Sequence, residues 1–172
     1  MDLFAFVKPK NELESRPEEQ TNVPFVPEEM WTKCPKCGTM LLTTDMEENF
    51  RVCTKCGHHF RMNAKQRVAL LADDGSFCEH DANMASKNIL DFPGYDQKLE
   101  KARATGSKES VMCGECKIGG IDAVLCAMDS DFMMGSMGTV TGEKITRAFE
   151  YATENALPVI VCTVSGGARM QE

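Results

Sequence analysis

Two pairs of cysteines, Cys34 with Cys37 and Cys53 with Cys56, constrain the fold of this chain more than any other feature. Each pair is spaced C-x2-C and fifteen residues separate the pairs, a spacing typical of a tetrahedral four-thiolate zinc site. A glycine directly follows each pair and admits the positive φ angle that such a turn requires. Four cysteine ligands leave no position for a water molecule. We therefore predict a structural rather than a catalytic zinc ion, and favour it over a disulfide pair or free thiols.

The remaining cysteines and the apolar pattern bear on the compartment. The chain has 172 residues and nine cysteines, but its first residues lack the basic start and the full apolar core of an export signal. No apolar run approaches the roughly 18 residues that a membrane span requires. We therefore predict a cytoplasmic protein without membrane association, in which the cysteines that do not bind zinc are free thiols.

Charge and composition divide the chain into four predicted segments. Residues 1–30 are rich in proline and glutamate and are expected to form a flexible leader, and residues 31–67 a zinc ribbon. Residues 68–106 are expected to form a helical connector, and residues 107–172 an α/β domain. The net charge is −7, yet the ribbon carries seven basic and three acidic side chains. Its surface could therefore meet the phosphates of a nucleic acid or of a nucleotide-like cofactor, or could simply be solvated.

Local patterns predict the secondary structure of both parts. In the ribbon, residues 40–42 and 49–52 are expected as two short strands, and Asn63 is placed to cap a helix over 64–71. Beyond the ribbon the pattern predicts, in order, a helix at 95–104, a hairpin of strands at 111–117 and 122–128, a helix at 142–156, a buried strand at 158–164 and a new helix from residue 165. This order indicates an α/β fold.

Two glycine-rich turns that follow predicted strands are the strongest candidates for chemistry. They contain Gly135, Ser136, Met137 and Gly138 in the first turn and Ser165, Gly166 and Gly167 in the second. Neither matches a phosphate-binding P-loop or a G-x-G-x-x-G turn, so nucleotide hydrolysis and hydride transfer lose support. Backbone N–H groups in such turns can instead stabilise an enolate or a tetrahedral oxyanion, although each could also be a simple tight turn.

No pair of side chains forms a convincing nucleophile and base. His58 and His59 adjoin the second cysteine pair, and His80 is expected in a loop. Cys113 and Cys116 form a third C-x2-C, which could be a redox pair or half of a second metal site, but which we interpret as two positions in a strand or hairpin. The pattern therefore favours oxyanion stabilisation by the main chain, with proton transfer left to the reactants.

Four stretches of the chain together resemble one known family. They are residues 26–34, 57–62, 132–138 and 165–172. On these stretches, residues 27–172 resemble the carboxyltransferase β subunit of bacterial acetyl-CoA carboxylase. The resemblance implies a four-cysteine zinc ribbon followed by a truncated crotonase-like domain built from a spiral of ββα units. Cys113 and Cys116 are not part of the family pattern.

The same resemblance implies an activity and partners. The activity is the transfer of a carboxyl group from carboxybiotin, carried on a biotin carboxyl carrier protein, to acetyl-CoA, which yields malonyl-CoA for fatty-acid biosynthesis. The implied partner is a carboxyltransferase α subunit in an α2β2 assembly, with the active site between α and β. Carboxybiotin that has released CO2 is a biotin enolate, which can take the methyl proton of acetyl-CoA. Both enolates then need oxyanion stabilisation more than a side-chain base.

The resemblance also implies roles for the glycine turns. The implied main-chain donors beside the acyl-CoA are Gly135, Ser136, Met137, Gly138, Gly166 and Gly167, and the residues implied near the acyl-CoA are Ser165, Ala168 and Arg169. The family's subunit continues past Glu172 through another glycine-rich turn. We therefore expect this chain to be a piece of a longer or split subunit, to be inactive alone and to expose apolar faces.

Three alternatives stay open at this point. A zinc-ribbon module could bind nucleic acid through its basic side chains. The ribbon could also serve only in assembly, as a lid over the acyl-CoA site. A related decarboxylase or a propionyl-type carboxyltransferase fits the glycine turns equally well, although the zinc ribbon favours the acetyl-CoA type.

Overall fold

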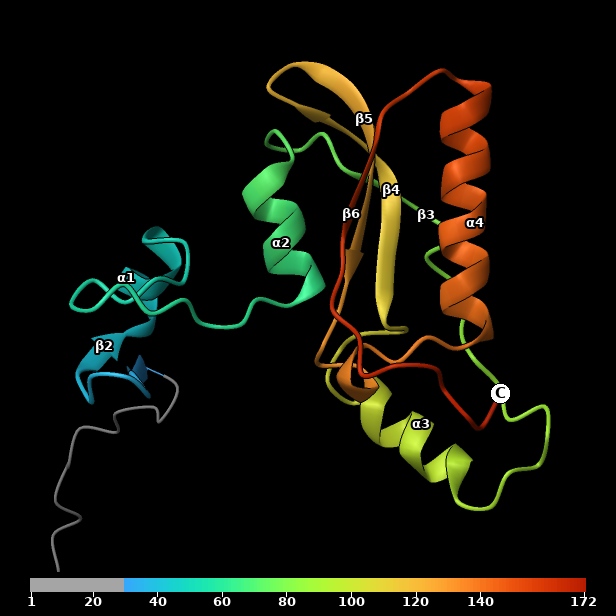
Figure 1. Ribbon diagram of the computed structural model, residues 1–172, viewed down its shortest axis with the longest axis horizontal. Coiled ribbons are helices and arrows are strands. Elements are labelled where there is room, and N and C mark those ends of the chain that lie inside the picture. Colours follow the sequence, from blue (N-terminus) through green and yellow to red (C-terminus); the bar gives the residue numbers. More distant parts are fainter. Residues whose placement is uncertain (1–29) are drawn as a thin grey trace, which may run out of the picture.

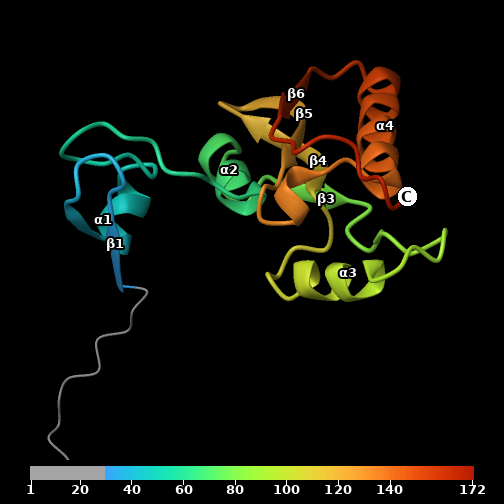
Figure 2. The same ribbon diagram turned by 60° about the horizontal axis from the view of Figure 1, so that its bottom comes forward.

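Two parts make up the structure, a computed structural model that describes residues 30–172. In Figures 1 and 2 a small module at the start of the described chain lies apart from a larger α/β part. The small module contains β1 (Trp31–Lys33), β2 (Met40–Leu42) and α1 (Thr43–Glu48). The α/β part contains α2 (Ala64–Leu71), β3 (Cys78–His80), α3 (Tyr95–Arg103), β4 (Val111–Ile118), β5 (Ile121–Met128), α4 (Thr139–Glu154) and β6 (Val159–Cys162). The predicted leader lies outside the described residues, apart from Met30.

The small module forms around a strand pair that differs in part from the prediction. β2 agrees with the strand predicted at 40–42, but its antiparallel partner is β1. The strand predicted at 49–52 is wrong, because α1 precedes it and the chain then reverses at Phe50 and Arg51, whose φ angles are 51° and 57°. Strand residues need negative φ angles. The reversal turns the chain back before the second cysteine pair.

α2 begins where its capping residue predicts. The side chain of Asn63 accepts a hydrogen bond from the backbone N–H of Gln66, and the side chain of Gln66 accepts one from the N–H of Asn63, which completes a capping box. The helix ends before Asp73, whose carboxylate accepts the N–H groups of Gly119 and Gly120 at 2.8 and 2.7 Å. The residues that end the helix thus also hold the distant turn between β4 and β5.

The sheet of the α/β part has the order β3-β4-β5-β6. The hairpin predicted at 111–117 and 122–128 is confirmed as β4 and β5, each one residue longer at the turn. β6 pairs parallel with β5 and is connected to it through α4. No sequence pattern predicts β3, whose three residues are too few to show a period of two. β3 lies so close to β4 that a Cβ atom at Gly114 would be 2.2 Å from the carbonyl oxygen of Cys78.

A helix covers each face of the sheet (Figure 1). α4 packs Ala148 and Ala152 into a core that includes Val124. α2 packs Val68 into a second core, which includes Leu125. Because successive residues of a strand point to opposite faces, these two neighbours on β5 belong to different cores. The sheet is therefore buried on both faces over most of β5.

Cys113 and Cys116 occupy opposite faces of β4. Cys113 lies with Cys126 in the core under α4, whereas Cys116 lies in the core under α2. The neighbouring Cys126 thiol and burial raise the pKa of Cys113, and burial raises the pKa of Cys116. Two thiols on opposite faces cannot share one metal ion or form a disulfide. The interpretation as two strand positions is confirmed.

The chain around α4 and after β6 differs from the prediction. α4 starts at Thr139, three residues earlier than expected. The helix predicted from residue 165 is not formed; instead, a parallel bridge joins Met137 to Ala168. Gly167 has a φ angle of 105°, which an α-helix cannot contain. The second glycine turn is therefore held by the first turn rather than by a helix of its own.

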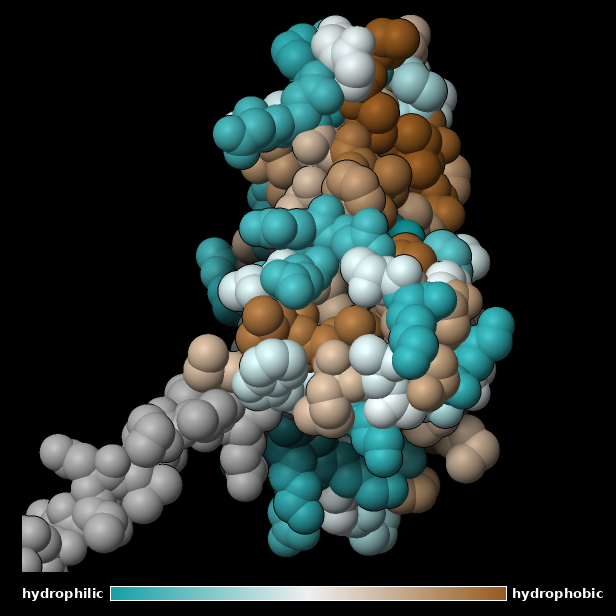
Figure 3. Space-filling model, turned by 90° about the vertical axis from the view of Figure 1, so that its left-hand side faces the viewer, coloured by the Kyte–Doolittle hydropathy of each residue, from teal (hydrophilic) through white to brown (hydrophobic). Residues whose placement is uncertain are grey.

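β6 lies at the edge of the sheet and is only partly buried. A strand is present where one was expected, at Val159–Cys162 within 158–164, but the expectation that it is buried is wrong, since Ile160 is 37% exposed. Phe149 on α4 and Val164 beyond β6 are exposed as well, as expected for uncovered apolar faces. Figure 3 shows hydrophobic residues gathered in the upper part of one face of the molecule, bordered by hydrophilic ones. Within the described residues, the helices are too short or too polar to cross a membrane.

Candidate functional site

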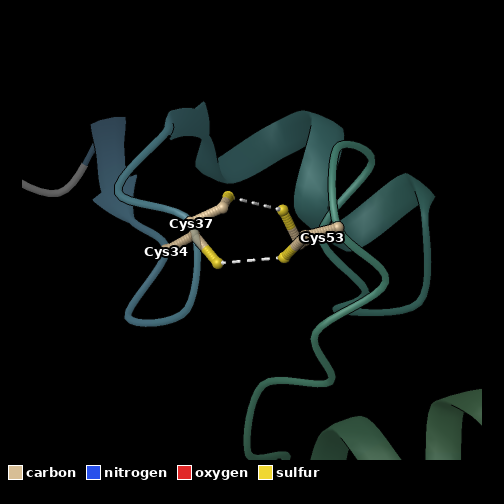
Figure 4. A group of neighbouring side chains, drawn as sticks. Cys34, Cys37 and Cys53 are labelled. Carbon is tan, nitrogen blue, oxygen red and sulfur yellow. Dashed lines mark hydrogen bonds between the residues drawn. The ribbon is translucent and has the colours of Figure 1, made fainter.

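The four predicted ligand cysteines converge on one point (Figure 4). Their sulfur atoms all lie within 4.8 Å of one another, with 3.7 Å between Cys34 and Cys56 and 3.7 Å between Cys37 and Cys53. A tetrahedral zinc ion with Zn–S bonds of about 2.3 Å would hold sulfurs about 3.8 Å apart. The donor set and its spacing therefore fit a structural zinc ion.

Equivalent backbone turns hold the two cysteine pairs. The N–H of Gly38 donates to the carbonyl oxygen of Cys34, and the N–H of Gly57 donates to that of Cys53, each at 2.9 Å. Both glycines have positive φ angles, 71° and 67°. The prediction that glycine permits these turns is confirmed, since other residues rarely adopt this conformation.

The thiols of the site titrate differently before any metal binds. Hydrogen bonds with Thr39 lower the pKa of Cys37 to about 6, whereas burial raises the pKa of Cys56 to about 12. A zinc ion at this point would bind all four cysteines as thiolates and would fix the module around them. His58 is stacked edge-on against Phe60 with ring centroids 5.2 Å apart, and the group of converging ligands consists of cysteines.

The two predicted glycine turns lie side by side, joined by main-chain hydrogen bonds. The N–H of Gly166 donates to the carbonyl oxygen of Met134 at 2.8 Å, and the N–H of Met137 donates to that of Gly167 at 2.9 Å. The N–H of Arg169 donates to the carbonyl oxygen of Met137, also at 2.9 Å. Segments about thirty residues apart therefore form a single structural unit at the end of β6.

Close approach of the two segments requires glycine at one position and leaves little room for a side chain at another. Gly135 has a φ angle of 70°, and a Cβ atom there would lie 2.3 Å from the carbonyl oxygen of Val164. A Cβ atom at Gly138 would lie 2.4 Å from a carboxylate oxygen of Glu172. At Gly166 the nearest atom would be 3.3 Å away, which a small shift relieves.

Most N–H groups of these turns already have partners. Those of Gly135, Ser136, Met137, Gly166 and Gly167 each donate to an oxygen atom of this chain. Across the described residues, the N–H groups of Gly138, Ser165 and Ala168 have no such partner. Of the six residues expected to supply main-chain donors, Gly138 alone therefore presents an uncommitted N–H in this structure.

A buried ion cluster fastens the turns to the rest of the α/β part. The Arg169 side chain is 1% exposed and donates to the carboxylate of Glu109 at 2.7 Å and to the carbonyl oxygen of Ser136 at 2.8 Å. It also pairs with Glu172 at 3.2 Å, and the Tyr95 hydroxyl donates to that carboxylate. Arg169, expected near the acyl-CoA, thus points into the protein.

Burial and hydrogen bonding fix the charges in this cluster. Burial and the contact with Glu172 raise the pKa of Tyr95 to about 12, so its hydroxyl stays protonated. Burial opposes the charge on Arg169, but its hydrogen bonds with Glu109 and Tyr95 raise the pKa of the guanidinium further. Burial likewise opposes ionisation of Glu172, yet hydrogen bonds, led by that from Tyr95, lower the pKa of its carboxyl group. The cluster therefore holds a permanent cation.

A cavity of about 410 Å³ opens beside the second turn. Ser165 and Gly166, two of the predicted site residues, line it together with Met134 of the first turn. Arg61, in the segment that leaves the small module, and Arg67, on α2, line the same cavity. This arrangement places two cationic side chains beside the paired turns.

Two family models match this chain. The model of the carboxyl transferase domain matches residues 59–172, and the model of the acetyl-CoA carboxylase zinc finger domain matches residues 31–56. The chain belongs to the carboxyl transferase domain family. Its fold is a four-cysteine zinc ribbon followed by a mixed α/β, crotonase-like carboxyltransferase region, as predicted.

Curated relatives and solved structures agree with this membership. The acetyl-coenzyme A carboxylase carboxyl transferase subunit beta of Clostridium botulinum is 52% identical over 155 residues, which is 90% of this chain and 54% of the relative. The subunit of the same name from Ruminiclostridium cellulolyticum is 49% identical over 170 residues, 98% of this chain and 59% of the relative. This chain therefore spans little more than half the length of these relatives.

Among solved structures, the transcarboxylase 12S hexamer with methylmalonyl-coenzyme A bound matches with a TM-score of 0.56 and 28% identity, over 65% of this chain and 20% of that chain. The beta subunit of P. aeruginosa geranyl-CoA carboxylase matches with a TM-score of 0.50 and 23% identity, over 74% of this chain and 20% of that one. This second match bears on the fold alone.

The buried cluster of this carboxyl transferase domain is what sequence reasoning missed. Glu109 and Tyr95 stand singly in the sequence, outside any motif. Glu109 does carry one usable signal, because it lies two residues before a strand that is buried on both faces. A carboxylate at such a position needs a partner. The partner is Arg169, sixty residues further along the chain.

Proposed function

We propose that this chain is the carboxyltransferase part of an acetyl-CoA carboxylase, which transfers the carboxyl group of carboxybiotin to acetyl-CoA and forms malonyl-CoA. The observation that carries the proposal is the unit of paired glycine turns, Met134–Gly138 and Ser165–Arg169, in a chain that carries both family domains in order. The zinc ribbon supports the acetyl-CoA type, since its family model is described as that of acetyl-CoA carboxylase.

The composition of the cavity supports a reaction without a side-chain base. Its lining has arginines, hydroxyls, apolar side chains and Cys162, but none of its residues carries a carboxylate, an imidazole or a lysine amine. A biotin enolate can itself take the methyl proton of acetyl-CoA. The chain then contributes main-chain N–H groups toward the developing enolate oxygen, and of the predicted donors Gly138 is uncommitted.

The proposal includes a place in a larger assembly. We infer a carboxyltransferase α subunit and a biotin carboxyl carrier protein as partners, in an α2β2 arrangement with the active site between α and β, in the cytoplasm. The exposed apolar residues around β6, with Ile160 and Val164 among them, supply a surface that such a partner could cover. Zinc would hold the ribbon and take no part in the chemistry.

The reverse reaction tests this function. Malonyl-CoA-dependent carboxylation of biocytin is measured with the zinc-loaded chain alone, with a purified α subunit alone and with both. We expect carboxybiocytin only from the mixture, because the active site needs both subunits. A mixture in which the two proteins form a stable complex but yield no carboxybiocytin would reject the proposal. Replacement of Gly135 by valine in the mixture should abolish product while zinc content is unchanged, since the turn cannot hold a side chain.

A further inference from the structure

A second cavity lies apart from the paired glycine turns. Its volume is about 170 Å³, and it shares no lining residue with the cavity beside the second turn. Three lysines from separate parts of the chain line it: Lys65 on α2, Lys108 in the segment before β4 and Lys144 on α4. The consecutive residues 106–109 form a further part of its lining. The cavity therefore gathers positive charge in a chain that is acidic as a whole.

Two of these lysines carry charges that no carboxylate compensates within the described residues. Lys65 donates to the carbonyl oxygen of Gly106 at 3.5 Å, and Lys108 donates to the side-chain oxygen of Asn83 at 3.2 Å. Both acceptors are neutral, and neither lysine takes part in an ion pair in the part of the chain that the structure describes. Each lysine is therefore able to form an ion pair with a ligand.

The third lysine is buried and has one more donor than it has acceptors. The Lys144 side chain is 2% exposed, pairs with Glu79 at 3.1 Å and donates to the carbonyl oxygen of Val111 at 3.3 Å. An ammonium group has three N–H bonds, so one of them is left without an acceptor among residues 30–172. The other carboxylate of the lining, that of Glu109, pairs with Arg169 at 2.7 Å. Three cations therefore line the cavity, and its two carboxylates already have partners.

The segment before β4 adds main-chain donors to the same cavity. Among the residues that the structure describes, no oxygen atom accepts a hydrogen bond from the N–H groups of Ser107, Lys108 and Glu109. Successive N–H groups in a turn can form a concave site for an anion. Unpaired N–H groups and ammonium groups are both hydrogen-bond donors, so the cavity offers donors and positive charge together. This combination is suited to an oxyanion.

We propose that this cavity binds a phosphate group, either as the free ion or as the end of a small ester. Its oxygen atoms accept hydrogen bonds from the N–H groups of residues 107–109 and form ion pairs with Lys65, Lys108 and Lys144. The cavity is smaller than the roughly 300–1,000 Å³ of sites for drug-sized ligands, so it holds one phosphate group rather than a whole coenzyme. Neither the site nor its ligand depends on the proposed function.

Calorimetric titration at constant ionic strength tests the site. Inorganic phosphate and glycerol 3-phosphate are titrated into the zinc-loaded 172-residue chain and into Lys65→Gln, Lys108→Gln and the double variant. Both lysines are exposed, so these variants should fold like the unmodified chain. Lys98→Gln on α3 is the matched control, because it removes one positive charge from an exposed position outside the cavity. The phosphate titration is repeated in the presence of coenzyme A.

We expect each of the two variants to weaken phosphate binding about tenfold and the double variant to weaken it more, since each loses a charge-assisted hydrogen bond. Lys98→Gln should bind phosphate like the unmodified chain. Tighter binding of inorganic phosphate would identify a free ion as the ligand, and tighter binding of the ester a phosphomonoester; either result sustains the site. Affinities that are equal in all variants, or no saturable binding to the unmodified chain, would overturn the proposal. Displacement of phosphate by coenzyme A would overturn it too, because the ion would then occupy a coenzyme site.

The main-chain contacts have a readout of their own. In the 15N-labelled, zinc-loaded chain, phosphate should shift the NMR signals of the N–H groups of residues 107–109, and these shifts should saturate with the calorimetric affinity. The ribbon carries basic side chains as well, so its N–H signals serve as the internal comparison. Shifts confined to the ribbon, with those of residues 107–109 unchanged, would show that phosphate is attracted to the ribbon surface and would reject the cavity as its site.

Discussion

The zinc ribbon and the α/β part both contain tight backbone turns, but the contacts that stabilise these turns differ. In the ribbon, Gly38 and Gly57 turn the chain, and four thiolates converge on one point. In the α/β part, Gly135 turns the chain, and the buried guanidinium of Arg169 draws the neighbouring segments together. Metal coordination is local in the sequence, whereas the ion cluster joins residues that lie far apart.

This difference predicts how the folding of each part responds when its stabilising contacts are removed. A module this small buries few apolar side chains, with Leu41 and Met46 at its centre, so it depends on its metal. The α/β part has a core on each face of its sheet and should therefore stay folded when one contact is removed. The single tryptophan, Trp31, lies on β1 and reports on the ribbon alone. The two parts can therefore be followed separately.

The largest expected effect is the loss of the ribbon on removal of zinc. Chelation, or Cys34→Ser, should unfold the ribbon, because structural zinc sites supply about 10 kcal/mol or more of binding free energy. Hydrogen exchange over β1 and β2 should become fast while that over β4 and β5 stays slow, and Trp31, which is 44% exposed in the folded ribbon, should change its fluorescence without a large red shift. Cys78→Ser, an exposed thiol on β3, is the control and should retain stoichiometric zinc. Melting of the sheet together with the ribbon would contradict the independence of the two parts.

The second effect is the loss of the buried cation. Arg169→Met leaves Glu109 and Glu172 without their partner in the interior and should lower the free energy of unfolding by about 3–5 kcal/mol. Chemical denaturation followed by far-UV circular dichroism measures this, with zinc content as a check on the ribbon. Arg147→Met, which breaks only exposed ion pairs, should cost at most about 1 kcal/mol. Equal costs for the two variants would show that the buried cluster adds no stability of its own.

A third, smaller effect distinguishes the glycines of the paired turns. Gly135→Ala should destabilise the α/β part by about 2–3 kcal/mol, because a Cβ atom there meets a carbonyl oxygen at 2.3 Å and the φ angle is positive. Gly166→Ala should cost less than about 1 kcal/mol, since its nearest neighbour would be 3.3 Å away. The same denaturation experiment compares them. A Gly166→Ala variant as unstable as Gly135→Ala would mean that the turns are packed more tightly than this structure has them.

The comparison also explains how much of the molecule its sequence predicts. Ligand spacing, the Asn63 cap and the alternation of apolar residues are short-range signals, so the zinc site, α2 and the β4–β5 hairpin were predicted closely. The positions of both glycine turns were predicted as well. The main-chain hydrogen bonds that join the two turns were not, since they depend on pairing between distant segments.

The errors follow from long-range contacts. The helix expected after Ser165 is replaced by pairing with Met137, and Arg169 turns inward to reach Glu109. Neither event leaves a periodic pattern in the sequence. The strand expected at 49–52 is wrong for a different reason: these residues lie in a turn closed by local hydrogen bonds, among them the bond from the Asn49 side chain to the carbonyl oxygen of Val52. The boundaries of the four predicted segments and the roles of the site residues stay predictions.

The smallest effect concerns acid, which should act on the two parts at different points. The pKa of Glu172 is lowered in the folded state, so its carboxylate stabilises the α/β part at pH values above its ordinary pKa, and this stabilisation is lost as the pH falls through the lowered value. Denaturation midpoints followed by circular dichroism should therefore decline on acidification in the unmodified chain and decline less in Glu172→Gln, which cannot titrate. Trp31 fluorescence should report zinc release in both proteins alike, because protons compete with the metal for the thiolates. Identical acid profiles by circular dichroism would show that Glu172 is not ionised in the cluster, and that Arg169 is neutralised by Glu109 alone.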